Sequence, residues 1–188
     1  MKYLFASDLH GSRTATEAVL TRMEAEKADR LILLGDLLYH GPRNPLPEGH
    51  DPMGVADLLN ALPVKPYAIR GNCDSEVDQM VLDFPIMGDY LLLPLANGAM
   101  AFITHGHLFN LGVRPPYRPG DVLVHGHTHV HTVETSEGLT YINPGSASLP
   151  KENQPRSYMT LDWGAGIFEI KTLDGELIRR HALPGAGT

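Results

Sequence analysis

Short apolar runs and amphipathic stretches alternate in the first part of the chain. Residues 2–7 and 30–35 are continuous apolar runs that predict buried strands, and residues 12–28 between them place apolar side chains at helical spacing. A strand, a helix and a strand within about 35 residues predict a βαβ unit with parallel strands. A helix at 55–62 and a strand at 64–71 continue this pattern, although Pro66 weakens the strand.

The second half of the chain predicts hairpins instead. Residues 90–106 read as two strands around a turn at 96–98, residues 122–126 as one strand, and residues 131–145 as a hairpin with Glu137 and Gly138 in its turn. Residues 157–163 and 166–183 predict three more strands, with Asp174 and Gly175 forming a typical hairpin turn. Parallel units followed by hairpins indicate an α/β fold with two packed sheets flanked by helices.

Composition narrows the possible partners. The length of 188 residues predicts one domain, residues 1–188, and the 43% hydrophobic and 20% charged residues are typical of a soluble globular chain. No apolar run approaches the ~20 residues that a membrane span needs. The single cysteine, Cys73, excludes an internal disulfide and favours a reducing, cytoplasmic compartment. A net charge of −7 argues against a broad nucleic-acid surface, but a recessed phosphate site with a bound metal remains compatible with it.

Aspartate, asparagine and histidine residues follow the ends of five predicted strands, each set beside a glycine. They are Asp8 and His10, Asp36, Asn72 and Asp74, His105 and His107, and His127 and His129. Ligands in open α/β sheets bind at the carboxyl ends of strands. One such residue alone is most often a cap or a solvated turn. Five sets side by side without a cation would leave buried polar groups unsatisfied, at roughly 1–3 kcal/mol each, so the pattern predicts a metal site.

The number of candidate ligands indicates two ions. Seven residues are too many for one first-row ion, and they are Asp8, His10, Asp36, Asn72, His105, His127 and His129. Oxygen and imidazole donors without thiolates suit Mn²⁺, Fe or Zn²⁺. One carboxylate can bridge two ions about 3.5–4 Å apart. Asp36 suits the bridging position, because it stands alone on its strand.

The ordered motifs DLH, GD, GNCD, THGH and GHTH, between residues 6 and 146, resemble those of the calcineurin-like metallophosphoesterases. Within that superfamily, the short chain, GNCD and the INPGS near residue 142 resemble the small bacterial and archaeal phosphodiesterases. The resemblance implies a two-sheet β-sandwich with helices outside, in four layers α/β/β/α. It implies hydrolysis of a small phosphodiester substrate by a hydroxide that two divalent metals activate. Manganese is the commonest activating ion implied, with Zn²⁺, Fe and Ni²⁺ as alternatives.

The resemblance also implies an assignment of the ligands. Asp8, His10 and His129 would hold one ion. Asn72, His105 and His127 would hold the other, and Asp36 would bridge the two.

Three residues are candidates for catalytic roles. Asn72 can donate its amide to a phosphoryl oxygen. Many superfamily members carry histidine after this asparagine to protonate the leaving group, whereas this chain has Cys73, a poorer donor. We therefore expect activated aryl esters to react far better than alkyl esters, although Cys73 can equally be a small buried residue without a role. His107 can orient a phosphate oxygen or a ligand.

Several further residues lie near these motifs. His125 and His131 share the spacing of His127 and His129, but we expect them to be supporting or surface residues. The proline-rich loop at 39–54 is expected to lie over the site, where Arg43 and Asn44 are candidates for substrate contacts. Ser146 is a weak candidate nucleophile, because no G-x-S-x-G turn surrounds it.

A non-catalytic scaffold or protein-binding module of the same fold is the alternative function. The retromer small subunit resembles this fold and has lost part of the ligand set, whereas all seven positions here carry residues able to bind metal. The exposed hairpins are compatible with a homo-oligomer that pairs sheet edges.

Overall fold

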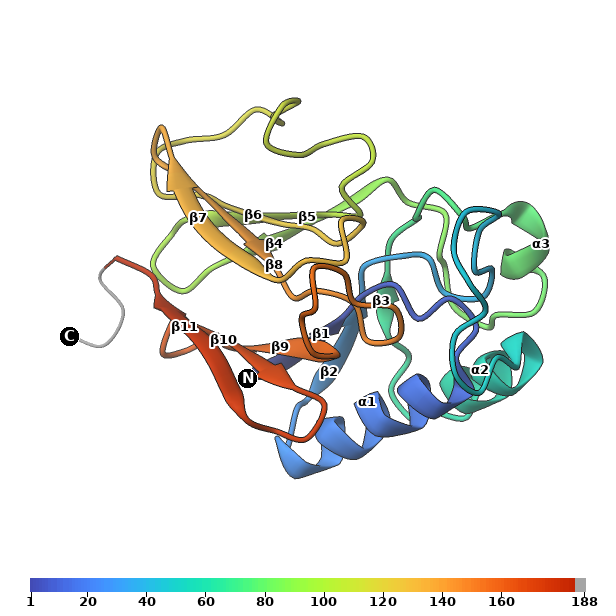
Figure 1. Ribbon diagram of the computed structural model, residues 1–188. Helices are drawn as coiled ribbons and strands as arrows, with labels where there is room; N and C mark the ends of the chain where they lie inside the picture. Colours follow the sequence, from blue (N-terminus) through green and yellow to red (C-terminus); the bar gives the residue numbers. More distant parts are fainter. Residues whose placement is uncertain (185–188) are drawn as a thin grey trace.

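The computed structural model describes residues 1–184, which form two β-sheets and three α-helices (Figure 1). The strands of the first sheet, in spatial order, are β11 (Leu177–Ala182), β10 (Ile167–Thr172), β9 (Ser157–Asp162), β1 (Lys2–Ala6), β2 (Arg30–Leu33) and β3 (Tyr67–Ala68). β1, β2 and β3 are parallel, and β9, β10 and β11 continue the sheet in antiparallel pairs. The predicted βαβ unit and the last three strands are therefore both present.

The second sheet contains the other five strands. They are, in spatial order, β4 (Tyr90–Pro94), β5 (Met100–Thr104), β6 (Val122–Val124), β8 (Leu139–Asn143) and β7 (Thr132–Ser136). β5, β6 and β8 are parallel, and the edge strands β4 and β7 are antiparallel to their neighbours. Glu137 and Gly138 both have positive φ, 53° and 83°, as the tight turn between β7 and β8 requires.

Alternating side chains of the first sheet pack on two sides. Leu4 and Leu31 face α1 (Arg13–Ala25) and α2 (Pro52–Asn60), whereas Phe5 and Ile32 face the second sheet. Figure 1 shows the resulting layers, with α1 and α2 below the first sheet and the second sheet above it. The short helix α3 (Glu76–Gln79) follows the loop after β3. None of the helices in residues 1–184 combines the length and the hydropathy of a membrane span.

The predicted two-sheet α/β sandwich is confirmed, with three local differences. α2 begins at Pro52 rather than residue 55, because the side chain of Asp51 accepts from the N–H of Gly54 and proline suits the first helical turn. β3 keeps only two residues of the expected 64–71. Among residues 1–184, no helix covers the outer face of the second sheet; there Tyr117, from the loop between β5 and β6, packs near Leu139.

The topology brings six loops to one end of the sandwich. Parallel strands carry the loops after β1, β2 and β3 to the same edge of the first sheet, and those after β5, β6 and β8 to one edge of the second. Backbone hydrogen bonds join these loops: Asp8 N–H donates to Gly35 O at 3.2 Å, and Ala147 N–H donates to Ser7 O at 3.0 Å. The candidate ligands lie in these loops.

Candidate metal centre

Five of the seven candidate ligands have a backbone conformation that L-residues rarely adopt. Their φ angles lie in the left-handed region, and they are Asp8 (56°), His10 (49°), Asp36 (54°), His127 (68°) and His129 (62°). This conformation costs a non-glycine residue roughly 1–2 kcal/mol. Such strain clusters at functional sites, where the surroundings hold it in place. No feature of the sequence predicted it.

Neighbouring glycines let these strained turns pack closely. A Cβ atom on Gly71 would overlap the carboxylate of Asp36, and one on Gly126 would overlap the hydroxyl of Ser7. The hydroxyl of Ser7 in turn donates to Asp8 Oδ2 at 2.5 Å. The glycines beside the motifs therefore allow backbone from one loop to approach a carboxylate on another.

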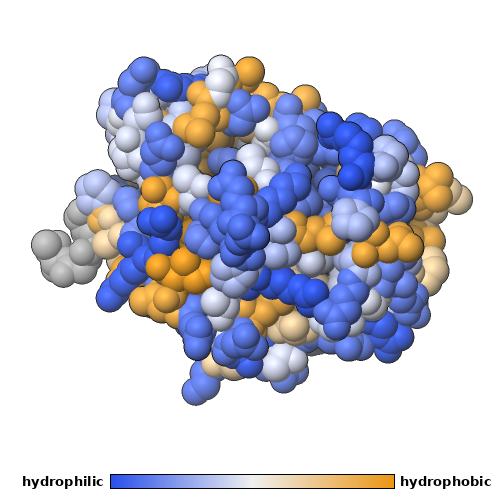
Figure 2. Space-filling model, in the orientation of Figure 1, coloured by the Kyte–Doolittle hydropathy of each residue, from blue (hydrophilic) through white to orange (hydrophobic). Residues whose placement is uncertain are grey.

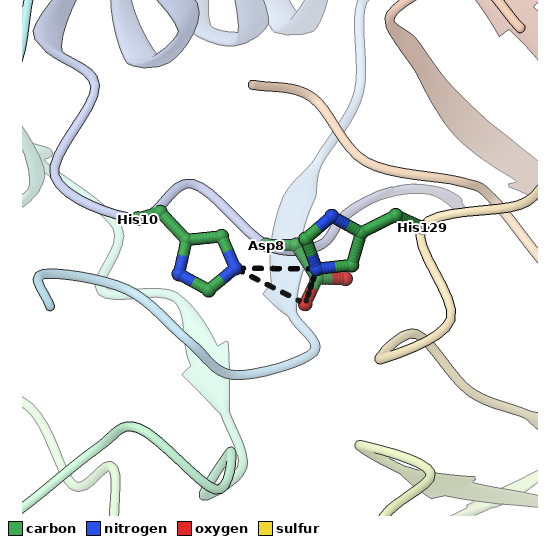
Figure 3. Close-up of side chains that lie close together, drawn as sticks. All are labelled: Asp8, His10 and His129. Atoms are coloured by element: carbon green, nitrogen blue, oxygen red, sulfur yellow. Dashed lines mark hydrogen bonds and ion pairs between the residues drawn. The ribbon is translucent and has the colours of Figure 1, made fainter. Parts of the chain in front are cut away.

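Asp8, His10 and His129 form a compact, buried group (Figure 3). His129 Nε2 lies 3.3 Å from Asp8 Oδ1, and His10 Nε2 lies 3.7 Å from the same oxygen. The two imidazoles approach each other with their Nε2 atoms 3.3 Å apart. Figure 3 shows both rings pointing at the carboxylate, one from the loop after β1 and one from the loop after β6.

The hydrogen bonds on the far side of both rings define which nitrogens face each other. His10 Nδ1 lies 2.8 Å from the carbonyl of Tyr39, and His129 Nδ1 lies 2.6 Å from the carbonyl of Leu149. A carbonyl only accepts, so each Nδ1 donates, and Nε2 of a neutral ring then presents a lone pair. Two lone pairs converge on Asp8 Oδ1, which is buried without a hydrogen-bond donor among the described residues. A cation in this position satisfies all three atoms, so these residues fit a divalent metal ion.

Asp36 joins this group to a second one. Its Oδ2 lies 3.7 Å from His10 Nε2 and 3.4 Å from His105 Nε2. His105 Nδ1 donates to the carbonyl of Leu34 at 2.7 Å, which turns Nε2 toward Asp36 and toward Asn72 Oδ1 at 3.1 Å. Asp36 therefore stands between the two sets of histidines, where a bridging carboxylate has to be.

His127 completes the second group from the other sheet. Its ring centroid lies 5.1 Å from that of His105, and its backbone N–H donates to Asp8 Oδ2 at 3.1 Å. The structure thus brings all seven candidate ligands to one place. Their role as metal ligands stays a prediction.

The electrostatics of the two groups favour positive charge. Burial alone would lower the pKa of His105, but the hydrogen bond to Asp36 and the charge of Asp8 raise it to about 9. Burial would likewise raise the pKa of Asp8, yet the contact with His129 and the nearby histidines lower it. Both shifts have the same meaning: buried carboxylates are held ionised and attract a cation.

The candidate catalytic residues lie at different positions around the site. Asn72 and Cys73 line a cavity of about 460 Å³ that also includes Asp36, His127 and His129. Burial, and then the charge of Asp36, raise the pKa of the Cys73 thiol to about 12, so the thiol keeps its proton at neutral pH. His107 is half-buried beside the ligands, 5.4 Å from the His105 ring and 6.3 Å from the His127 ring. It is not among the residues that line the cavity.

The loop after β2 borders the same cavity. Arg43 and Asn44 line it together with Gly41 and Pro42. The side chain of Asn44 donates to the carbonyl of His40 at 2.8 Å and closes this turn. The part of the 39–54 loop that borders the cavity is therefore its first third.

Several residues support the site in ways that the sequence did not predict. Asp74, a polar strand-end residue outside the seven candidate ligands, is buried and accepts from the backbone N–H groups of Asp36, Leu37 and Gly71 at 2.7–2.8 Å. Ser146, the weak candidate nucleophile, is fully buried, and its hydroxyl donates to the carbonyl of Asp8 at 2.9 Å. Gly145, directly before Ser146, and Asn72, two residues before Asp74, were the sequence signals that these two loops approach the site.

Asn143 supports the GHTH segment. Its amide donates to the carbonyl of Gly126 at 2.8 Å and to the hydroxyl of Thr128 at 2.9 Å. His125, expected to be a supporting or surface residue, is buried beside this amide, with Nδ1 3.4 Å from Asn143 Nδ2. The INPGS segment thus holds the loop that carries His127 and His129.

Comparisons with known proteins bear on this site. The family described as "Calcineurin-like phosphoesterase superfamily domain" matches residues 1–166. Phosphodiesterase YfcE of Escherichia coli strain K12 is 50% identical over 162 residues, which cover 86% of this chain and 88% of YfcE. A solved structure of YfcE, a phosphoesterase from E. coli, matches with a TM-score of 0.92 at 46% identity and covers 97% of this chain and 100% of that chain.

More distant relatives share the fold. The probable metallophosphoesterase YsnB of Bacillus subtilis strain 168 is 31% identical over 170 residues, covering 86% of this chain and 83% of YsnB. Vacuolar Protein Sorting 29 from Cryptosporidium parvum matches at 19% identity with a TM-score of 0.62, covering 96% of this chain and 97% of that chain, a likeness of fold alone. On the family match and the YfcE identity, this chain belongs to the calcineurin-like phosphoesterase superfamily and is a phosphoester hydrolase.

Proposed function

We propose that this enzyme hydrolyses small phosphodiesters and depends on two divalent metal ions. Metallophosphoesterases use divalent metals, and this chain has the candidate ligand groups. The preference for diesters rests on 50% identity to the phosphodiesterase YfcE. The observation that carries the proposal is the pair of imidazole Nε2 atoms 3.3 Å apart beside an unpartnered, buried carboxylate oxygen.

Seven residues would hold the two ions. Asp8, His10 and His129 would hold the first, which agrees with their mutual contacts and full burial. Asn72, His105 and His127 would hold the second, and Asp36 would bridge, because its carboxylate lies between His10 and His105. Manganese is the ion that we expect to activate best, with Zn²⁺, Fe and Ni²⁺ as alternatives of similar donor preference.

When bound, two such ions supply Lewis acidity and lower the pKa of the attacking water. The protein's own residues do the rest. Asn72 is exposed at the cavity, so its amide N–H can donate to a phosphoryl oxygen of the substrate. The protonated thiol of Cys73 is a weak donor to the leaving oxygen, so we expect aryl esters to react faster than alkyl esters. His107 would orient an oxygen from beside His105 and His127.

The proposal is tested with bis(4-nitrophenyl) phosphate as substrate. The chelated protein should be inactive, and adding Mn²⁺ should restore hydrolysis with two ions bound per chain by elemental analysis. Asp36→Asn should remove activity and reduce the number of bound ions. Asp57→Asn is the matched control, because Asp57 is an exposed carboxylate on α2 outside the cavity. This variant should keep the activity and the number of bound ions.

Two results would contradict the proposal. One is hydrolysis that survives metal removal. The other is a protein that binds two ions but hydrolyses neither a diester nor a monoester, which would favour the scaffold function. We also propose that residues 1–188 act as one domain, because the seven ligands come from loops of both sheets. A cytoplasmic location and a homo-oligomer stay predictions, which localisation by fractionation and measurement of solution mass would test.

A further inference from the structure

The cavity beside the candidate ligands is larger than a reacting phosphate needs. Its volume of about 460 Å³ lies in the range of pockets that hold whole small molecules, about 300–1,000 Å³. The candidate ligands and their neighbours form one part of its lining: Asp36, Asn72, Cys73, His127, Thr128 and His129. The remainder comes from two loops, residues 41–44 after β2 and Lys151 between β8 and β9. These two loops therefore line a part of the cavity that a reacting phosphate at the candidate ligands would leave free.

Each loop contributes one cation to the cavity. Arg43 and Lys151 are both exposed, and within residues 1–184 neither has a carboxylate within 4 Å. The other cation of the β8–β9 loop is neutralised: Arg156 pairs with Glu48. Two cations without a partner are thus available inside one cavity, in a chain whose net charge is −7.

Both cations lie at the same end of the candidate metal centre. Tyr39, whose carbonyl accepts from His10, precedes Arg43 by four residues in the same loop. Leu149, whose carbonyl accepts from His129, precedes Lys151 by two residues. The backbone N–H of Lys151 also donates to the carbonyl of His129 at 3.1 Å. The loops that orient the two imidazoles therefore also carry the two cations.

The two loops are held against the site and against each other. Arg156 Nη2 lies 2.8 Å from Glu48 Oε2, an ion pair that joins the β8–β9 loop to the loop after β2. A Cβ atom on Gly41 would lie 3.1 Å from Cys73 Sγ, so the turn before Arg43 rests directly on the cavity wall. Figure 2 shows hydrophilic side chains over the centre of this face, where the β8–β9 loop lies in Figure 1. This positioning is what a preformed subsite needs.

We propose that Arg43 and Lys151 bind a second anionic group of the substrate, a carboxylate or phosphate on one ester arm, and so select diesters that carry such a group. This inference rests on the proposed phosphodiesterase function. The physical reason is that both cations can form charge-assisted hydrogen bonds with an anion that extends from the reacting phosphate. The alternative is that Arg43 and Lys151 are solvated surface residues that do not contact the substrate.

The test uses two diesters of nearly the same shape that differ in the charge of one arm. They are 2-carboxyethyl 4-nitrophenyl phosphate and its neutral amide, 2-carbamoylethyl 4-nitrophenyl phosphate, with the same leaving group. We expect the manganese-loaded enzyme to prefer the carboxyethyl ester, with roughly a three- to fivefold lower KM for each cation engaged. A third substrate, 2-phosphonoethyl 4-nitrophenyl phosphate, carries a dianionic arm. The lower KM of the two charged substrates shows whether the subsite prefers a phosphate-like dianion or a carboxylate.

Variants assign the preference to the two residues. Arg43→Gln and Lys151→Gln should each reduce the ratio of kcat/KM between the two esters, and the double variant should bring it close to one. Lys151→Arg should retain most of the ratio, because it keeps the charge. Arg118→Gln, an exposed cation outside this cavity, is the control and should leave the ratio as it is. An enzyme without a preference, or a double variant that keeps it, overturns the inference.

A binding measurement separates this inference from the proposed function. If none of the esters is hydrolysed, the phosphodiesterase function fails. Calorimetry with two phosphonates then decides the inference without turnover. The manganese-loaded protein should bind 2-carboxyethylphosphonate several-fold more tightly than propylphosphonate, and the double variant should bind both equally. Equal affinities in the unmodified protein would overturn the inference.

Discussion

Asp74 offers the sharpest test of how the fold positions the metal centre, because it touches the turn of a ligand and no part of the cavity. Its buried carboxylate accepts backbone N–H groups of Asp36, Leu37 and Gly71. Asp74→Ala would leave three buried donors without an acceptor, each at about 1–3 kcal/mol. We expect the free energy of unfolding to fall by about 3–5 kcal/mol. Because the turn of Asp36 loses its anchor, the affinity for Mn²⁺ should fall roughly 10- to 100-fold.

Two assays separate the structural from the functional part of this effect. Urea denaturation gives the loss of stability, and manganese titration followed by calorimetry gives the loss of affinity at a temperature where the variant is folded. Asp74→Asn keeps the shape but replaces an acceptor by a donor, so it should weaken manganese binding with a smaller loss of stability. Asp78→Ala is the control: its carboxylate also accepts a backbone N–H, at the start of α3, but touches no candidate ligand. Manganese affinity that is unchanged in both Asp74 variants would refute the anchoring role.

Three further outcomes follow from the structure. Removing the metals with a chelator should lower the Tm by roughly 5–10 °C, because an ion at 100 times its Kd contributes about 2.7 kcal/mol; an unchanged Tm in calorimetry would contradict the metal fit. Burial alone would raise the pKa of Glu26, but hydrogen bonds from Lys171 and Lys2 lower it to about 2. Its contribution is therefore present above pH 4.5 and lost as the pH falls toward 2, so Glu26→Gln should cost about 1–2 kcal/mol in urea denaturation at pH 7 and almost nothing at pH 2. Cys73→His should raise the rate of hydrolysis of alkyl diesters more than that of aryl diesters. If the variant and the unmodified enzyme hydrolyse every substrate at the same rate, residue 73 has no role in leaving-group protonation.

The sequence predicted the positions of the candidate ligands better than their supports. Asp8 and Asp36 could be placed together because each follows a strand of one parallel unit, whose carboxyl ends meet at one edge; His105 follows β5 of the second sheet, and only its residue type and strand-end position indicated that it belongs with them. Strand ends are visible as transitions from apolar runs to glycine and polar residues. This signal is local in the sequence, so it can be recognised without knowledge of how the segments pack.

The supports were invisible because they depend on contacts between distant segments. Asp74 stands two residues after Asn72 at the end of a predicted strand, but nothing in the sequence showed that its carboxylate accepts from backbone N–H groups 37 and 38 residues earlier. The missing helix on the outer face of the second sheet has a similar cause. The segment between β5 and β6 contains prolines and glycines that end helices, but only the structure shows that Tyr117 packs there.

The strained turns of the candidate ligands and the lone pairs that converge on Asp8 Oδ1 differ in what stabilises them. Backbone hydrogen bonds hold the strained turns, from Asp8 N–H to Gly35 O at 3.2 Å and from His10 N–H to Asp36 O at 2.9 Å, but Asp8 Oδ1 is buried with no hydrogen-bond donor among the described residues. We expect a bound ion to remove the cost at Asp8 Oδ1, and binding to the folded chain alone would then add to its stability. The residues proposed to hold the ions come from loops of both sheets, so bound ions would also join the two sheets. For this reason the loss of stability on chelation and the loss of phosphodiester hydrolysis should follow the same metal titration curve.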